Sequence, residues 1–384
     1  MKISFKIICC LTILLIVLQA CLDNSKKIVI EQPPYISKQD VKIDTDSSFY
    51  DSIVKKISIP RFIVLNEDNE TMYSDIDKVL CYSDKYYILD KTGCRVVVSF
   101  LSDGKPFRKY GDVGQGPGEY TCPWDIDVDS EHLYILDSNE KKIIQYSVDG
   151  NFIKEWKLPF YADAFKKLDN GNFLFNILPN GDTGAQICIS DSSISNFKYY
   201  LRYDKDYLGG LLTNNIFRKG LMPKSSIYFR ASLDTMYLIN SNGIPNKTIS
   251  FDFQDKGLSK RAKNDFIAER KDGKNRINYA FRFGDTPIPI AENLWLGVIY
   301  NDKEQYTIIF DSETNRCGGR KFGTHSSIYD INEPVGCDGN GNIIGILDID
   351  IANECYDFSN LDENLKKSLK DGNRIITLHK LNLK

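Results

Sequence analysis

An internal repeat of about 47 residues constrains this 384-residue chain more than any other feature. Residues 86–111 read YYILDKTGCRVVVSFLSDGKPFRKYG, and residues 133–158 read LYILDSNEKKIIQYSVDGNFIKEWKL. Each unit holds an apolar run ending in Asp, a polar turn, a second apolar run, Asp-Gly and a third run. Asp-Gly between apolar runs is a strong β-hairpin signal. A repeat of this length built from antiparallel strands is typical of a β-propeller blade.

Fainter copies of the unit continue to the end of the chain, over residues 168–175, 234–253, 293–311, 338–347 and 374–381. The early strand 57–65 needs a partner, and the first and last strands of a propeller commonly share a blade because this removes exposed sheet edges. We therefore expect an all-β fold, a single β-propeller over residues 57–384 with six blades of four antiparallel strands. Because the middle copies are weak, a ring of five or of seven blades is kept as an alternative.

Two segments interrupt the strand pattern with helix formers. Residues 258–270 read LSKRAKNDFIAER, with Ser259 as the expected N-cap, and residues 361–369 read LDENLKKSL. We expect both as short helices on the rim of the disc.

Residues 1–20 have the features of a signal peptide. Lys2 and Lys6 precede an apolar run over 7–18, which is shorter than the ~20 residues that a membrane-spanning helix needs. The run ends in Leu-Gln-Ala-Cys21, which resembles the lipobox of bacterial lipoproteins. The resemblance implies cleavage before Cys21, acylation of its thiol and attachment to a membrane of the cell envelope, with the outer membrane expected and the side left open. An uncleaved N-terminal membrane helix is the alternative.

The stretch that follows, residues 21–56, is polar and contains Pro33-Pro34, so we expect a flexible tether between the lipidated Cys21 and the propeller.

Seven of the ten cysteines lie beyond Cys21: Cys81, Cys94, Cys122, Cys188, Cys317, Cys337 and Cys355. Their number is odd and no Cys-x-x-Cys occurs, which argues against a zinc site. One interpretation is that they are small buried apolar residues. An oxidising compartment would also allow a disulfide, with Cys81–Cys94 or Cys317–Cys337 as the pairings left open.

The segment 110–120, YGDVGQGPGEY, is rich in glycine but lacks Gly-Lys-Ser/Thr and is followed by a strand pattern. It is therefore neither a phosphate-binding nor a dinucleotide-binding loop. We expect its glycines to adopt positive φ where the outer strand of one blade crosses to the inner strand of the next.

With DIDVD at 125–129, LYILD at 133–137 and the run 143–150, the segment 114–120 resembles the six-bladed β-propeller lipoproteins of bacterial envelopes. These are similar to NHL-repeat propellers. The resemblance is strong over residues 57–160. It implies the fold and a cell-envelope location, and it implies no catalytic residues.

No catalytic constellation stands out. The three histidines, His132, His325 and His379, are not at metal-ligand spacings, and no Gly-x-Ser-x-Gly marks a nucleophile. The run 338–342, DGNGN, resembles the start of a calcium loop, but its sixth position is Ile343 and its twelfth is Ile349, so a hairpin turn is the better interpretation. We predict no catalytic residues, no metal ligands and no cofactor, with Ca²⁺ left open.

Some propeller enzymes hold a metal in the central channel with carboxylates of the inner strands. Asp125, Asp127 and Glu333 could lie near the starts of such strands. Nothing in the sequence shows that they converge.

For binding, the mouth of the central channel is the expected place, because loops of all the blades meet there. We predict as ligand-binding residues Trp124, Asp125, Arg276, Tyr279 and Arg282, since aromatic residues and Arg dominate recognition surfaces. The opposing interpretation is that Trp124 packs between blades and the arginines are solvated. A formal net charge of −3 argues against nucleic acid as a partner.

These features predict an envelope lipoprotein whose propeller is a binding module for a protein, a peptide or a glycan. The alternative is a metal-dependent hydrolase or lyase of the lactonase or NHL-like type, which rests on analogy of fold alone.

Overall fold

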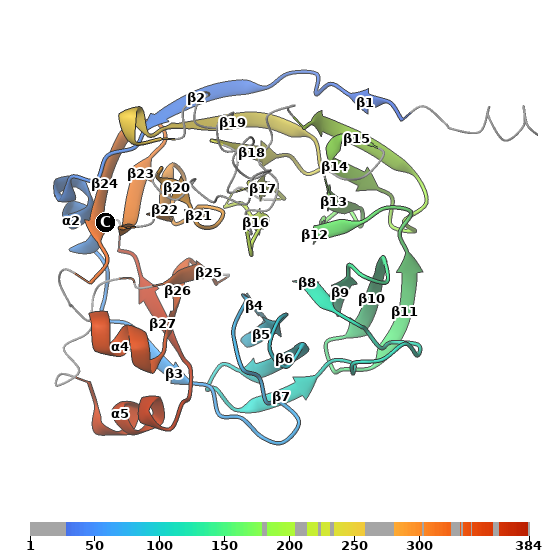
Figure 1. The fold of residues 1–384 in the computed structure, drawn as a ribbon, viewed down its shortest axis with the longest axis horizontal. Coiled ribbons are helices and arrows are strands. Elements are labelled where there is room, and N and C mark those ends of the chain that lie inside the picture. The colour runs from blue at the N-terminus through green and yellow to red at the C-terminus, as the bar shows by residue number, and fades with distance from the viewer. Residues whose placement is uncertain are drawn as a thin grey trace, which may run out of the picture.

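Six antiparallel sheets are arranged as a ring around a central axis (Figure 1). The structure is a computed structural model. It describes residues 28–178, 183–203, 213–221, 224–230, 234–257, 280–301, 303–323, 331, 333–338, 340–355 and 361–382. The predicted all-β propeller with six blades is confirmed.

Each blade runs from an inner strand at the axis to an outer strand at the rim. Blade 1 comprises β4 (Lys78–Tyr82), β5 (Lys85–Asp90), β6 (Val96–Leu101) and β7 (Pro106–Lys109). Blade 2 comprises β8 (Pro123–Val128), β9 (His132–Asp137), β10 (Lys142–Ser147) and β11 (Phe152–Lys157). Blade 3 comprises β12 (Ala162–Lys167), β13 (Phe173–Ile177), β14 (Ala185–Ser190) and β15 (Phe197–Arg202).

The other three blades are less regular. Blade 4 comprises β16 (Phe217–Lys219), β17 (Ser226–Tyr228), β18 (Thr235–Ile239) and β19 (Pro245–Asp252), followed by the 3₁₀ turn Gln254–Lys256. Blade 5 has a divided inner strand, β20 (Arg282–Phe283) and β21 (Ile288–Pro289), then β22 (Leu294–Tyr300), β23 (Gln305–Asp311) and β24 (Arg316–Lys321). Blade 6 comprises β25 (Pro334–Cys337), β26 (Asn342–Leu347) and β27 (Ile375–Lys380).

An early strand closes the ring. β3 (Arg61–Val64) pairs antiparallel with β27 and becomes the outer strand of blade 6. The predicted sharing of a blade by the first and last strands is therefore confirmed.

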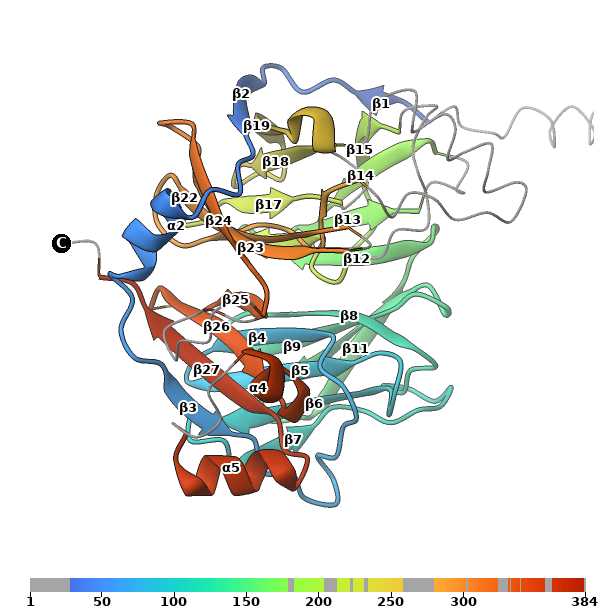
Figure 2. The same ribbon diagram turned by 60° about the vertical axis from the view of Figure 1, so that its left-hand side comes forward.

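The segment before β3 wraps around the rim (Figures 1 and 2). β1 (Ile30–Glu31) adds to β15 of blade 3, and β2 (Ser37–Lys42) adds to β19 of blade 4, both in parallel. The helix α2 (Ser47–Val54) then packs on blade 5, with Tyr50 only 1% exposed. We call residues 28–57 the strap.

The strap corrects the predicted boundary at residue 57. Residues 37–54 were expected in a flexible tether because they are polar overall, but their backbone pairs with a blade edge and four apolar side chains of α2 are buried. An edge strand that gains a pairing partner satisfies backbone groups which would otherwise face solvent. The folded body therefore begins before residue 57.

Helices cover the rim of blade 6. The predicted helix at 361–369 is found as α5 (Glu363–Lys370), with Asp362 as its N-cap. α4 (Ile349–Cys355) was not predicted. The predicted helix at 258–270 lies outside the described residues.

The core consists of one apolar cluster between each pair of neighbouring blades, and a further cluster beneath α4 and α5. Aromatic rings fill these clusters; Phe251 of blade 4 and Phe283 of blade 5, for example, lie with centroids 4.6 Å apart. Each fully buried ring of this kind contributes about 1.5–3 kcal/mol. Blade-to-blade packing, rather than a single central core, holds the disc together.

The repeated Asp at the end of the second strand ties each early blade to its incoming loop. In blade 1 the Asp90 carboxylate accepts from the backbone N–H groups of Ser74 at 2.8 Å and Gly93 at 2.8 Å. In blade 2 the Asp137 carboxylate accepts from the N–H of Thr121 at 2.7 Å. These two carboxylates therefore cap the ends of the second strands.

The glycine-rich segment is the crossover from blade 1 to blade 2. Gly111 and Gly118 have φ of +69° and +77°, which confirms the predicted conformational role. A Cβ at Gly118 would lie 2.8 Å from the ring of Phe152, so the segment also needs glycine for its close approach to blade 2.

The six described cysteine side chains beyond residue 28 are free thiols. Cys81 and Cys94 lie toward opposite ends of blade 1, and Cys317 is on an outer strand whereas Cys337 is on an inner strand. Neither disulfide that the sequence left open is present, because the first pair lies at opposite ends of one blade and the second pair lies on two different blades.

Candidate functional site

A pocket of about 820 Å³ opens at one mouth of the central channel, where the inner strands end. We call it the mouth pocket. Every blade contributes to its lining: Lys78–Tyr82 from blade 1; Asp127–His132 and Tyr134 from blade 2; Lys166–Asp169 and Gly171 from blade 3; Asn215, Phe217–Leu221 and Lys224–Ser226 from blade 4; Ile288 and Pro289 from blade 5; Gly336–Asp338 from blade 6. The predicted meeting of all the blades at one channel mouth is therefore a property of this structure.

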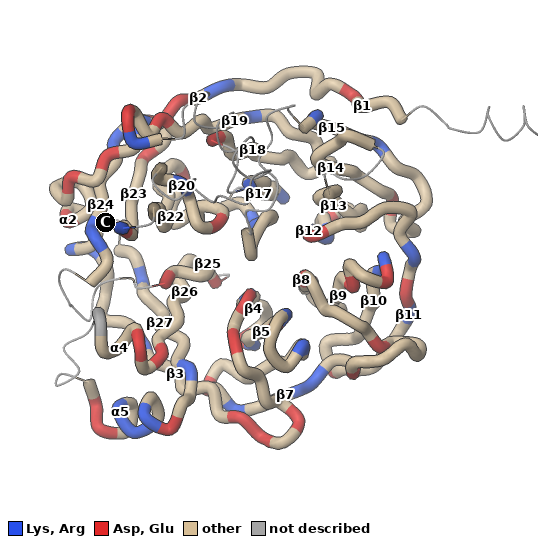
Figure 3. The backbone as a smooth tube through the Cα atoms, viewed as in Figure 1, with Lys and Arg blue, Asp and Glu red and all other residues tan. Residues whose placement is uncertain are grey.

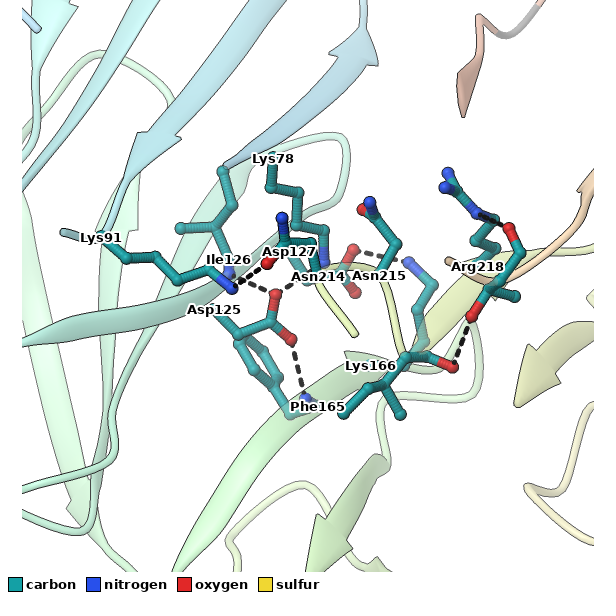
Figure 4. Close-up of polar contacts among 12 residues, drawn as sticks. Lys78, Lys91, Asp125, Ile126, Asp127, Phe165, Lys166, Asn214, Asn215 and Arg218 are labelled. Carbon is teal, nitrogen blue, oxygen red and sulfur yellow. Dashed lines mark hydrogen bonds and ion pairs between the residues drawn. The ribbon is translucent and has the colours of Figure 1, made fainter. Parts of the chain in front are cut away.

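The wall of the channel consists of ion pairs that bridge blades (Figure 4). The Lys78 ammonium of blade 1 lies 2.7 Å from the Asp125 carboxylate of blade 2, and both side chains are almost fully buried. The Lys166 ammonium of blade 3 lies 2.5 Å from the Asp127 carboxylate of blade 2. Blade 2 thus receives a cation from each of its neighbours.

The same two carboxylates also satisfy the free edge of the next inner strand. Asp125 accepts from the backbone N–H of Phe165 at 2.9 Å, and Asp127 accepts from that of Lys167 at 2.7 Å. An inner strand has no pairing partner on its channel side, so its outward N–H groups need acceptors. The i, i+2 spacing of Asp-Ile-Asp matches the strand period and places both carboxylates on one side. Burial raises the pKa of Asp125, and the Lys78 ammonium and the Phe165 N–H oppose that shift.

Arg218 serves the opposite side of the ring. Its guanidinium donates to the Asp285 carboxylate at 3.0 Å, to the Thr286 carbonyl at 2.8 Å and to the Val335 carbonyl at 2.7 Å. It therefore joins blades 4, 5 and 6, and burial lowers its pKa. Five donors in a rigid plane suit Arg to this task.

The predicted ligand-binding residues are not gathered in the mouth pocket. Trp124 and Arg282 both lie at the start of an inner strand, toward the other mouth. The Lys91 ammonium lies 5.5 Å from the centre of the Trp124 ring, and the Arg282 guanidinium lies 4.4 Å from that of Tyr300. Asp125 is buried in its ion pair. Arg276 and Tyr279 lie outside the described residues.

Sequence reasoning missed Lys78, Lys166 and Arg218, which line the pocket. A signal existed, because each is a cation within a short strand pattern whose other side is apolar, and a buried cation needs a carboxylate partner. The pairing partners could not be read from the sequence, since they lie on other blades.

The histidines and the possible metal residues lie apart. His132 lines the mouth pocket beside Asp129, His379 is fully buried in blade 6, and His325 lies outside the described residues. Asp338 accepts from the N–H groups of Asn340 and Asn342, both at 2.8 Å, as in the predicted hairpin turn. Over the described ranges, no group of three or more His, Cys, Asp or Glu side chains is placed to hold a metal ion.

Within those same ranges, none of the helices has the length and apolar character needed to cross a membrane.

The chain matches the family model described as "Domain of unknown function (DUF4934)" over residues 39–381, so it belongs to that family. The match begins within the strap, in agreement with the corrected boundary. A search of the curated proteins finds no match.

Solved structures that are similar to this chain include one with a closely matching fold. A candidate exported protein from Bacteroides fragilis is 18% identical, with a TM-score of 0.67 over 90% of this chain and 99% of that chain. A DUF4221 family member from Bacteroides vulgatus is 11% identical (TM-score 0.48, 85% of this chain and 98% of that chain). Virginiamycin B lyase from Staphylococcus aureus is 12% identical (TM-score 0.45, 79% of each chain). At these identities the first likeness concerns the fold alone, and the other two are too distant to support an argument.

Proposed function

We propose that this member of the DUF4934 family is a binding module of the cell envelope that holds a polar ligand in the mouth pocket. The observation that carries the proposal is the convergence of all six blades on one cavity of about 820 Å³. Ligand pockets are typically clefts of roughly 300–1,000 Å³. A concave site of this size suits the end or a loop of a protein, a peptide or a glycan better than it suits a flat protein face.

The lipid anchor is the second part of the proposal. It rests on the lipobox-like Leu-Gln-Ala-Cys21 and on where the described chain begins. Ile30 is the first residue that joins a blade, and it does so at the rim, on blade 3. The nine Cα–Cα steps from Cys21 to Ile30 can span at most about 30 Å. An acylated Cys21 would therefore hold the rim near the membrane and leave both mouths accessible from the side.

The binding proposal is tested with a pair of tryptophan substitutions in blade 2. Ser130→Trp places a large side chain at the mouth pocket, and Asn139→Trp makes a similar change at the opposite end of β9. Residues 22–384 are screened by thermal unfolding against defined short peptides and oligosaccharides. A stabilising compound should lose its effect with Ser130→Trp and keep it with Asn139→Trp. Equal stabilisation of both variants would place binding elsewhere and overturn the proposal.

The same assay decides on the metal-dependent hydrolase or lyase, which no arrangement of described residues favours. The protein is treated with EDTA and then with millimolar Ca²⁺, Mg²⁺ or Zn²⁺. A specific ion at a hundredfold excess over its Kd stabilises by about 2.7 kcal/mol. A clear increase in Tm with one ion would count against a simple binding module and would justify a search for lactone and ester substrates.

The anchor is tested in a bacterial host. The wild-type protein should partition into the detergent phase of a detergent extraction, and Cys21→Ala should not be acylated. Detergent partitioning that persists in a mature Cys21→Ala protein would refute the anchor.

A further inference from the structure

The charged residues around the mouth pocket are not evenly distributed. Lys219 and Lys224 belong to the hairpin of blade 4. Asp129 and Glu131 belong to blade 2, and Asp338 belongs to blade 6. Blades 2 and 6 flank blade 1, which lies across the ring from blade 4, so the mouth has a basic side and an acidic side. Figure 3 shows both signs of charge around the centre of the ring.

Two exceptions do not remove this polarity. Asp169 lies on blade 3, next to the basic side, and Lys167 of the same blade is half-buried. The Lys167 ammonium already contacts the Gly171 carbonyl and lies 3.9 Å from the centre of the Phe173 ring. These two opposite charges on one blade largely offset one another.

Three of the charges at the two sides differ from those in the channel wall because they are not paired, whereas the Asp129 and Asp338 carboxylates already accept hydrogen bonds from neighbouring residues. Lys219, Lys224 and Glu131 are exposed, and none of their side chains makes an ion pair or hydrogen bond with any other described residue. Lys166 and Arg218, by contrast, are already paired with Asp127 and Asp285. Asp129 accepts from the Tyr134 hydroxyl at 2.9 Å, which holds its carboxylate in place at the acidic side.

A pocket with separated charges selects a ligand with separated charges. A neutral sugar gains nothing from the separation, and a polyanion is repelled by the acidic side as much as it is attracted by the basic side. A short peptide carries an ammonium group at one end and a carboxylate at the other, and it offers backbone amides for the polar wall between them.

We propose that the mouth pocket binds a short zwitterionic peptide, with its carboxylate at Lys219 and Lys224 and its ammonium group at Asp129 and Glu131. This inference rests on the proposed function, since it assigns a chemical class to the same pocket.

The probes are four forms of tetra-alanine: both termini free, N-acetylated, C-amidated, and blocked at both ends. A tetramer of N-acetylglucosamine is the neutral comparison. Binding to residues 22–384 is measured by calorimetry at low salt and at 0.5 M salt. We expect the free peptide to bind at least tenfold more tightly than either singly blocked form, and high salt to remove most of the difference, since salt screens exposed charges.

Charge reversal assigns each end of the peptide. Lys219→Glu with Lys224→Glu should remove the preference for a free carboxylate and keep the preference for a free ammonium group. Glu131→Lys should do the reverse. The control is Lys55→Glu with Lys56→Glu, which makes the same change in net charge at exposed positions of the strap and should bind like the wild type.

The outcomes separate this inference from the proposed function. If all four peptides bind alike and Ser130→Trp abolishes their binding, recognition of the charged ends is wrong and the mouth pocket stands. If only the sugar binds and Ser130→Trp abolishes its binding, the peptide class is wrong and the mouth pocket stands. If peptides bind and Ser130→Trp has no effect, both the class and the site are wrong.

Discussion

Acid should destabilise the closing blade through one buried imidazole. His379 lies on β27 opposite Ile343, and its side chain is completely buried. Its Nε2 lies 3.2 Å from the Thr377 hydroxyl, and its Nδ1 is buried with no hydrogen-bond partner among the described residues. An imidazolium must donate from both nitrogens, so the site accepts only the neutral ring. Burial accordingly lowers the pKa of His379 from 6.5 to about 4.

The sign and the size of the effect follow from linkage. Because the folded pKa is lower than the unfolded value, His379 costs nothing above pH 6.5, and stability is lost as the pH falls from 6.5 toward 4. At pH 5 the loss is about 2 kcal/mol, and below pH 4 it approaches about 3 kcal/mol. Domains of ordinary stability have 5–15 kcal/mol in total, so this single group is a large part of the acid sensitivity.

The assay is urea unfolding of the wild type and of His379→Leu at pH 8, 7, 6 and 5. Other groups titrate as well, so the informative quantity is the difference between the two proteins. The wild type should lose about 2 kcal/mol more than His379→Leu between pH 8 and pH 5. Thr377→Val keeps the imidazole and should keep the acid sensitivity. Parallel pH profiles for the wild type and His379→Leu would refute the reasoning.

Three further substitutions, two of them with a comparison variant, test the framework that shapes the site, each by urea unfolding. Asp125→Asn should cost about 3–5 kcal/mol, because it leaves a buried ammonium group unpaired in the channel wall; a cost below 1 kcal/mol would contradict the ion-pair wall. Tyr50→Ala should cost about 3–5 kcal/mol if the strap is part of the fold, and Tyr35→Ala, at a 74% exposed position, should stay within about 0.5 kcal/mol. Gly111→Ala meets both positive φ and the Tyr146 hydroxyl, so it should cost more than Gly323→Ala, which has similar φ but open space around it; equal costs would show that the close approach does not matter.

Local patterns explain why most of the fold could be predicted. The strand–turn–strand units at 86–111 and 133–158 carry their hairpins in the sequence, because Asp-Gly and strand alternation are signals that act over a few residues. The closing strand followed from a rule about sheet edges rather than from its own residues. Neither the local hairpin signals nor the rule about sheet edges predicted α4 and the strap. Both depend on pairing or packing with elements far along the chain, such as β2 with β19, and a polar edge strand of the type SKQDVK has no periodic signal of its own.

The polar residues at the channel also divide into a part that the sequence predicts and a part that depends on distant residues. Asp125 and Asp127 are adjacent in the pattern, and their place on an inner strand was expected, yet what they do is decided by Lys78 and Lys166 on two other blades. Their spacing fits the strand period, so one Asp-Ile-Asp run can hold two cations and cap the free edge of the next inner strand at the same time. Those carboxylates are already fully used in the wall. Under the proposed function, a ligand is recognised by charges left over, among them Lys219, Lys224 and Glu131, which lie in or next to turns where a sequence pattern predicts only a solvated loop. The paired charges hold the ring in shape, and the unpaired charges at its mouth are the ones that can select what binds.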